Sequence, residues 1–395
     1  MVMNMNNKNW VSVWGNAVSI AEHHPEAYAK YITLRYPVYI PFAGDTLRFT
    51  FDNYCGSEAV TVTRATVSAA TSPVYEKMPL ACPCKKETIC DITFSKNESV
   101  TMEAHQTAVS DPVSFPVKKG MTLTVSLYFA DFTLMQSAVL VTGPLSKGFF
   151  SLGDQTHADA LPMDTTKTTN WFYFLSNIEL MTAEENHTVI CYGDSITAGA
   201  WPDYLTLLAR QNPDNHTAFI RRATSGSSVL RQYECITYDS YGLKGTNRFP
   251  HEIPTTGADT VIIQQGINDI IHPVGIETNP FRPMSDLPTA KELIDGYRYY
   301  IEEAKKLHLK VYMGTLLPIF GWRTYATFRD DLRNELNAWI RSAKEIDGCI
   351  DFDLALRGSE NPSAFREGFD SGDHLHPSSK AYQAMAECAY EVLQR

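Results

Sequence analysis

The chain has 395 residues, more than one domain usually contains and enough for two. Its 34 Lys and Arg residues against 45 Asp and Glu residues give a formal net charge of −11, so the chain as a whole repels nucleic acid and anionic lipid. The hydrophobic fraction of 44% is ordinary for a folded globular protein and excludes wholesale disorder.

The sequence shows no segment that would direct the chain into or across a membrane. The longest apolar region, residues 127–141, is interrupted by Asp131 and Gln136 and falls short of the roughly 18 clean residues that a span needs. Residues 1–8 lack a basic segment followed by an apolar one, so no signal peptide is recognisable. We therefore expect a soluble cytoplasmic protein, secreted only if a leader has been removed, with no nucleic-acid or membrane partner.

The eight cysteines are expected to be reduced thiols in that compartment. Cys82, Cys84 and Cys90 lie close together, and His105 could supply a fourth ligand to a structural zinc ion. However, the two-residue spacing usual between paired zinc-binding cysteines is absent. We therefore predict a loop of free thiols and no metal.

The N-terminal half has the pattern of short antiparallel strands. Between Tyr31 and about Gly143, apolar residues alternate with polar ones and are rich in Thr, Val, Phe and Tyr; the predicted strands include residues 46–51, 59–62, 99–102 and 122–128. Many short strands without helical stretches between them predict a β-sandwich. Residues 144–186 are less regular, so we predict a connection there and an N-terminal domain over residues 1–185.

After residue 186 the pattern changes to strands that alternate with helices. Five short apolar runs are typical of buried strands: residues 188–192, 218–220, 259–264, 310–314 and 349–352. Helical periodicity covers residues 293–304, 332–343 and 382–393. The alternation predicts a doubly wound parallel five-stranded sheet in a second domain, residues 186–395, whose ligands bind at the carboxyl ends of the strands.

Polar residues and glycines follow three of these predicted strands. Ser195 comes directly after the first strand, where a serine can act as a nucleophile or simply cap the next helix. Gly226 follows the second strand, and its backbone N–H could approach a substrate oxygen, although a tight turn would also use glycine. Asn268 follows the third strand and could donate from its side-chain amide or form an Asx turn.

A fourth group lies near the C-terminus. Asp373 and His376 are three residues apart, so on a turn the carboxylate can hold the imidazole in one tautomer and the imidazole can act as a base. His374 is the alternative base, but its position next to Asp373 is expected to point it elsewhere. A His-x-His metal site lacks a nearby Cys or Glu cluster to complete it.

Together these four groups resemble the sequence blocks of the SGNH (GDSL) hydrolase superfamily. The matching positions are Gly193-Asp194-Ser195, Gly226, Gly266-x-Asn268-Asp269 and Asp373-x-x-His376. Further stretches resemble one subfamily of aryl- and acetylesterases, some encoded beside xylan-degrading enzymes of gut and rumen anaerobes. These stretches are Trp201-Pro202-Asp203, residues 315–318, 333–340 and 373–377, and in the N-terminal half residues 10–15, 33–35 and 47–53.

The resemblance implies a flavodoxin-like SGNH fold and a role for each matching residue. Ser195 would attack an ester carbonyl, His376 would transfer the proton, and Asp373 would orient His376. The oxyanion would be held by the backbone N–H groups of Ser195 and Gly226 and by the side chain of Asn268. No cofactor is implied. We also expect Trp201, Trp322 and Arg323 to line the substrate pocket.

These residues predict a serine esterase acting on short-chain, acetyl esters of carbohydrates. Two alternatives stay open: a carbohydrate-binding protein with a non-hydrolytic SGNH domain, and an acyltransferase or thioesterase that uses the same triad. The N-terminal domain could bind carbohydrate or form a wall beside the active site. Of these two roles, we expect the wall.

Overall fold

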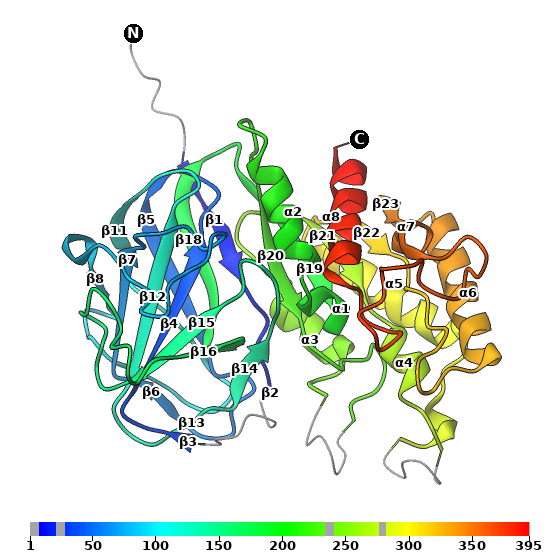
Figure 1. The fold of residues 1–395 in the computed structure, drawn as a ribbon, viewed down its shortest axis with the longest axis horizontal. Helices are drawn as coiled ribbons and strands as arrows, with labels where there is room; N and C mark the ends of the chain where they lie inside the picture. The colour runs from blue at the N-terminus through cyan, green and yellow to red at the C-terminus, as the bar shows by residue number, and fades with distance from the viewer. Residues whose placement is uncertain (1–7, 21–27, 234–240, 276–281, 395) are drawn as a thin grey trace. The chain divides into compact units, whose positions relative to one another are not determined.

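The computed structural model describes residues 8–20, 28–233, 241–275 and 282–394 (Figure 1). The chain divides into two compact units. The N-terminal unit comprises residues 1–188 together with residues 213–220, and the C-terminal unit comprises residues 189–212 and 221–395.

The N-terminal unit is built from antiparallel strands in two larger sheets and three small ones. The first larger sheet contains β1 (Lys8–Gly15), β18 (Leu175–Ala183), β5 (Gly44–Asp52) and β10 (Thr107–Val109) in that order, and β11 (Val113–Val117) also pairs with β5. The second has the order β16 (Lys167–Thr169), β15 (Gly148–Leu152), β4 (Ile32–Tyr39), β12 (Thr122–Phe129), β7 (Arg64–Ala69) and β8 (Cys90–Ile92). The small sheets pair β3 (Tyr28–Ala29) with β13 (Thr133–Leu134), β6 (Val60–Val62) with β9 (Val100–Met102), and β14 (Ser137–Leu140) with both β2 (Ser19–Ile20) and β17 (Trp171–Tyr173). The four strands named from the sequence are confirmed within β5, β6, β9 and β12.

The prediction of an irregular connection over residues 144–186 is wrong. This segment contains β15, β16, β17 and β18, and β18 lies between β1 and β5 in the first sheet. Nearly all of β18 is buried, so it lacks the alternation that reveals a strand with one wet face. Gly148 does not mark a loop either: it lies in β15, where a Cβ atom would come within 2.7 Å of the Tyr36 ring.

The cysteine-rich segment covers part of the second sheet. Cys82 packs with Met78, Phe149 and Leu161 in a buried cluster. Beside it the fully buried Arg35 donates hydrogen bonds to the Cys82, Gln155 and Ala158 carbonyls and to Ser126 Oγ. Because the guanidinium contacts backbone carbonyls from two separate loops, it holds both of them against the sheet.

The cysteines of the described residues are free thiols. Burial raises the pKa of the Cys82 thiol to about 12, so this thiol is an inert core group. His105 Nδ1 contacts the carbonyl of Tyr54 instead of a thiol. Among the described residues, no group of three or more His, Cys, Asp or Glu side chains is arranged to hold a metal ion.

Most of a parallel five-stranded sheet, in a mixed α/β fold, belongs to the C-terminal unit; residues 187–188 and 217–220 of its first two strands fall in the range of the other unit. Its strand order is β20 (Thr217–Ala223), β19 (His187–Gly193), β21 (Ala258–Gln264), β22 (Lys310–Gly314) and β23 (Gly348–Ile350). Six helices of this unit form two sets, and within each set the helices pack against one another. In the first set α2 (Trp201–Arg210) and α7 (Phe352–Leu356) pack against α8 (Ser379–Leu393). In the second, α5 (Ala290–Lys306) packs against α3 (Gly245–Glu252) and α6 (Thr327–Ser342).

The five strand runs and three helical patterns predicted for this unit are confirmed, with one shift of a boundary. The last run extends too far, because the strand ends at Ile350 and Asp351 accepts a hydrogen bond from Leu354 N–H to cap α7. Helices α2 and α3 were not predicted. None of the described helices is long and apolar enough to cross a membrane.

Candidate active site

Ser195 lies at a tight turn between strand β19 and helix α1 (Ser195–Ala198). The turn depends on Gly193, where a Cβ atom would lie 2.3 Å from the carbonyl oxygen of Gln264. Asp194 then caps the helix by accepting a hydrogen bond from the backbone N–H of Ile196 at 3.0 Å. The sequence Gly-Asp-Ser therefore fixes a half-buried serine at the carboxyl end of a central strand.

His376 connects Ser195 to Asp373 through both of its ring nitrogens. The distance from Nε2 to Ser195 Oγ is 2.9 Å, and the distance from Nδ1 to Asp373 Oδ2 is 2.6 Å. A carboxylate at Nδ1 favours the tautomer with its proton there, which leaves Nε2 free to accept the proton of the serine hydroxyl. The structure thus brings the three predicted triad residues into one continuous hydrogen-bonded chain.

The turn that carries His376 is stabilised largely by two carboxylates. Asp373 accepts hydrogen bonds from the backbone N–H groups of Leu375 at 3.0 Å and His376 at 2.8 Å. Asp370 accepts from the N–H groups of Gly372 at 2.8 Å and His374 at 2.9 Å. Partial burial alone would raise the pKa of Asp373, but hydrogen bonds from the ring and backbone of His376 lower it to about 2.

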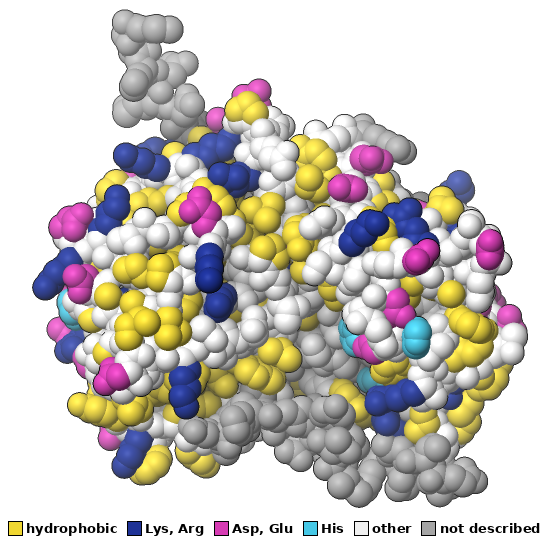
Figure 2. All heavy atoms as spheres, in the orientation of Figure 1, with side chains coloured by type: hydrophobic (Ala, Val, Ile, Leu, Met, Phe, Trp, Pro, Cys, Tyr) yellow, Lys and Arg dark blue, Asp and Glu magenta, His cyan; other side chains and the backbone are white. Residues whose placement is uncertain are grey.

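His374, the alternative base, points away from the serine. Its Nδ1 contacts the carboxylate of Asp370, and its ring packs against Gly321, where a Cβ atom would lie 2.8 Å from the imidazole. The side chains of His374 and His376 are 52% and 32% exposed, and Figure 2 shows histidines beside acidic side chains on the surface of the C-terminal unit.

Gly226 and Asn268 follow the two strands that flank β19. Gly226 comes after β20 and has a φ of 76°, and a Cβ atom there would lie 2.2 Å from the ring of Tyr241. Asn268 lies on α4 (Ile267–Ile271), after β21, and donates from its side-chain amide to the carbonyl of Ser227 at 3.1 Å. Strand order and this hydrogen bond place both residues at the same edge of the sheet as Ser195.

Asp269 also stabilises the loop that follows Gly226. Its carboxylate accepts hydrogen bonds from the backbone N–H groups of Val229 at 2.7 Å and Leu230 at 2.9 Å. Burial raises the pKa of this carboxyl to about 6, although those backbone donors favour its charged form. The Asn-Asp pair of the third block therefore acts on the Gly226 loop with both of its side chains.

Sequence reasoning missed a buried arginine that joins two of the blocks. Arg248 is 1% exposed and pairs with Glu252 at 2.8 Å. The same guanidinium donates to the carbonyl of Gly193 at 3.3 Å and to Ser227 Oγ at 2.8 Å. Arg248 therefore contacts both Gly193, two residues before the nucleophile, and Ser227, the residue after Gly226. The i,i+4 spacing of Arg248 and Glu252 on α3 was the available signal.

Asp194 is a buried carboxyl next to the nucleophile. Its Oδ1 atom caps α1, whereas Oδ2 is buried with no hydrogen-bond partner among the described residues. Burial raises the pKa of this carboxyl to about 7.

The three residues predicted to line a substrate pocket have different environments. Trp201 has no exposed surface; its ring packs 5.6 Å from that of Phe352 and its N–H donates to Thr197 Oγ1 at 3.3 Å. Trp201 is therefore a core residue, contrary to the prediction. Trp322 is half-buried and the guanidinium of the exposed Arg323 lies 4.7 Å from its ring centroid, so both offer surface to a ligand.

Sequence reasoning also missed His272, which lies one turn after Asn268. Its ring stacks at 4.5 Å on Tyr241, the side chain that packs against Gly226. Burial, together with the positive charges of Arg282 and Arg323, lowers the pKa of His272 to about 3. This histidine is therefore a neutral packing group, and no pattern in the sequence distinguishes it.

Comparison with known families agrees with this geometry. Residues 191–384 match the model of the GDSL-like Lipase/Acylhydrolase family. The part of the chain that carries Ser195, Asn268 and His376 is thus similar to the GDSL-like lipase/acylhydrolase family.

Several solved structures are similar to about half of this chain. A GDSL-like lipase from Bacteroides thetaiotaomicron VPI-5482 is 20% identical with a TM-score of 0.39, over 53% of this chain and 89% of that one. A catalytic mutant of an acetylxylan esterase from Geobacillus stearothermophilus is 17% identical with a TM-score of 0.40, over 52% and 93%. The structure of TesA is 16% identical with a TM-score of 0.38, over 53% and 98%. No curated protein matches the chain.

Proposed function

We propose that the chain is a serine ester hydrolase whose nucleophile is Ser195, whose general base is His376 and whose orienting carboxylate is Asp373. The hydrogen-bonded chain from Asp373 through His376 to Ser195 Oγ carries this proposal. A serine hydroxyl is a weak nucleophile on its own and needs a base within hydrogen-bond reach, which His376 Nε2 provides.

In the first step, Ser195 Oγ attacks the ester carbonyl carbon and its proton passes to His376 Nε2. The resulting imidazolium is stabilised by the Asp373 carboxylate. As the tetrahedral intermediate collapses, His376 gives the proton to the leaving alcohol oxygen and an acyl-serine remains. Water then attacks the acyl-serine with His376 again as the base, which releases the acid and restores Ser195.

The oxyanion formed in each step would accept hydrogen bonds from the N–H groups of Ser195 and Gly226 and from the amide of Asn268. Their placement at one sheet edge, and the bond from Asn268 to Ser227, support this assignment. One such donor typically contributes a factor on the order of 10²–10³ to the rate.

We propose short acyl chains, above all acetyl, on a carbohydrate alcohol as the substrate. This part of the proposal comes from the resemblance to the aryl- and acetylesterase subfamily. The half-buried Trp322 beside Arg323 offers an aromatic face and a cation at the surface, which suits a polar substrate.

The test is a p-nitrophenyl ester chain-length series together with acetylated xylo- and manno-oligosaccharides, on wild type and Ser195→Ala. We expect hydrolysis of the p-nitrophenyl esters to be confined to short acyl chains and acetate to be released from the sugars. Both activities should be lost in Ser195→Ala. Residual activity of Ser195→Ala within tenfold of wild type would overturn the nucleophile. Silence on all esters would favour a binding protein, and ester formation with an added alcohol would favour an acyltransferase.

We also propose that residues 1–185 and 186–395 are the two domains and that the two larger N-terminal sheets form a β-sandwich. The proposed border falls in the turn between β18 and β19. Every residue of β4 and β12 is buried, so both faces of the second sheet are covered at its centre. A β-sandwich requires that one face of each sheet is covered by the other sheet, and the burial agrees with this.

A further inference from the structure

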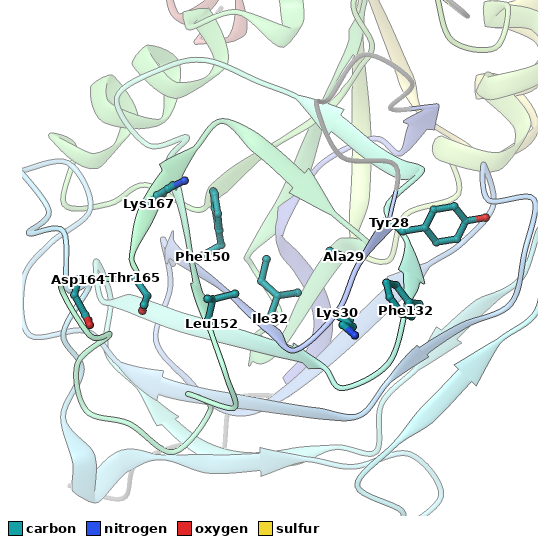
Figure 3. Close-up of a pocket in the computed structure, with 10 residues that line it drawn as sticks. All are labelled: Tyr28, Ala29, Lys30, Ile32, Phe132, Phe150, Leu152, Asp164, Thr165 and Lys167. Atoms are coloured by element: carbon teal, nitrogen blue, oxygen red, sulfur yellow. The ribbon is translucent and has the colours of Figure 1, made fainter.

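The N-terminal unit carries a pocket of about 500 Å³ (Figure 3). In this view the apolar side chains of Phe150, Leu152 and Ile32 lie between two sets of residues, each of which includes polar side chains. Asp164, Thr165 and Lys167 stand at one end, and Lys30, Phe132 and Tyr28 stand at the other. The pocket therefore has an apolar centre with polar side chains on both sides of it.

The centre of the pocket follows from strand geometry. Phe150 and Leu152 alternate on β15 with Phe149 and Ser151, which are fully buried. In the ladder, Leu152 is paired with Ile32 of β4, and Phe150 with Lys167 of β16. Directly paired side chains share one face of a sheet, so these four residues form a continuous surface on the second sheet.

This surface is unusually apolar for one in contact with water. Phe132 is 70% exposed, Leu152 is 57% exposed and Tyr28 is 46% exposed. Large apolar side chains that are exposed singly need no explanation, but three that line one pocket mark a site of interaction.

The polar groups of the pocket include both donors and acceptors. Lys30 Nζ lies 4.4 Å from the centroid of the Phe132 ring, so its cation is held over an aromatic face. Thr165 Oγ1 shares a hydrogen bond of 2.7 Å with Ser151 Oγ. The exposed Asp164 carboxylate and Lys167 ammonium make no hydrogen bond or ion pair with any other described residue, so both can serve a ligand.

We propose that this pocket binds an oligosaccharide chain. A sugar ring has an apolar C–H face that stacks on aromatic rings and hydroxyl groups that both donate and accept, which matches Phe132 and Phe150 beside Asp164 and Lys167. A fatty acyl chain would instead desolvate Asp164 and Lys167 without hydrogen-bonding them, at a cost.

The choice of sugar for the test rests on the proposed function, whereas binding itself needs no catalysis. The pocket lies wholly within the N-terminal unit, and the triad lies within the C-terminal unit. An unacetylated sugar therefore probes the pocket without turnover, and hydrolysis of p-nitrophenyl acetate probes the triad without the pocket.

The experiment is isothermal titration of the full chain with xylohexaose, and with cellohexaose and mannohexaose as alternatives. The variants are Phe132→Ala, which removes a ring from the surface, and Asp164→Asn, which removes a charge at nearly constant shape. The matched control is Phe328→Ala, a phenylalanine 48% exposed outside the pocket. All three replace exposed side chains, and thermal melts check that the fold is retained.

We expect at least one hexasaccharide to bind, with Kd raised at least fivefold by Phe132→Ala and by Asp164→Asn and unchanged by Phe328→Ala. Turnover of p-nitrophenyl acetate should stay within twofold in all variants. Absence of binding to every hexasaccharide, or equal Kd values in wild type and both pocket variants, overturns the proposal. Decanoate, titrated in the same way, serves as a fatty-acyl probe. If decanoate binds, loses this binding in Phe132→Ala, and no hexasaccharide binds, the proposal is also overturned. Sugar binding without any esterase activity would sink the proposed function alone.

Discussion

The carboxyl of Asp194 leads to a prediction about the pH dependence of stability. Its folded-state pKa is raised to about 7 from the ordinary value of 3.8 because the group is fully buried. Between these two values the folded state binds a proton more tightly than the unfolded state does. The free energy of unfolding therefore falls as pH rises through this window, and the stability contributed by the protonated form is lost by about pH 7.

Replacing Asp194 with asparagine removes this titration and keeps the oxygen that caps Ile196 N–H. With about 1.36 kcal/mol per pKa unit, the wild type should lose about 3 kcal/mol relative to Asp194→Asn between pH 4.5 and pH 8. The amide also buries two N–H donors in place of Oδ2, which costs about 1–3 kcal/mol at every pH. This cost shifts the difference in unfolding free energy between the two proteins by the same amount at every pH, so it does not change how that difference depends on pH.

The assay is urea denaturation of both proteins at half-unit steps from pH 4.5 to pH 8. Groups that do not interact with Asp194 titrate alike in both proteins and cancel in the difference, whereas Asp269, whose negative charge helps to raise the pKa of Asp194, leaves a smaller pH-dependent remainder. A difference in unfolding free energy that does not depend on pH would refute the reasoning, because it would mean that Asp194 titrates alike in the folded and unfolded chain.

Three further predictions concern the site. His376→Ala should reduce kcat/KM for p-nitrophenyl acetate by about 10³-fold or more and His374→Ala by less than tenfold; the reverse ranking would assign the base to His374. Asn268→Ala should lower kcat about 10²–10³-fold with little change in KM, and a change confined to KM would remove Asn268 from the oxyanion hole. Arg248→Met should destabilise the fold by about 3–5 kcal/mol in urea denaturation because Glu252 is left buried without its partner. If Arg248→Met with Glu252→Leu is no more stable than the single variant, the unpaired charge is not the cause.

The sequence predicted the elements whose burial pattern is simple. The five strands of the parallel sheet are short apolar runs, and α5, α6 and α8 have a clear helical period. Helix α2 was not predicted, although its buried residues Trp201, Leu205 and Ala209 repeat at a four-residue spacing. Strand β18 was missed because both of its faces are covered, and Gly148 in β15 suggested a loop when it reflects the close approach of Tyr36.

The site was predictable in its blocks and not in what supports them. Gly-Asp-Ser and Asp-x-x-His are local motifs whose backbone turn follows from the residues themselves. Arg248 and His272 act through contacts with Gly193, Ser227 and Tyr241, which lie far from them in the sequence. Such contacts depend on the packing of α3 and α4 on the sheet, so the i,i+4 spacing of Arg248 and Glu252 could indicate an ion pair on a helix but not these distant partners.

The triad residues lie on two segments that differ in the free energy needed to open them. Ser195 follows a buried interior strand, whereas His376 and Asp373 belong to a partly exposed turn held by carboxylate-to-backbone hydrogen bonds and a short backbone bridge. Local opening of such a turn costs less free energy than unfolding of the sheet. On heating, activity should therefore disappear reversibly at temperatures where the sheet is still intact, and a cross-link or ligand that braces only residues 370–377 would extend the working range without raising the melting temperature.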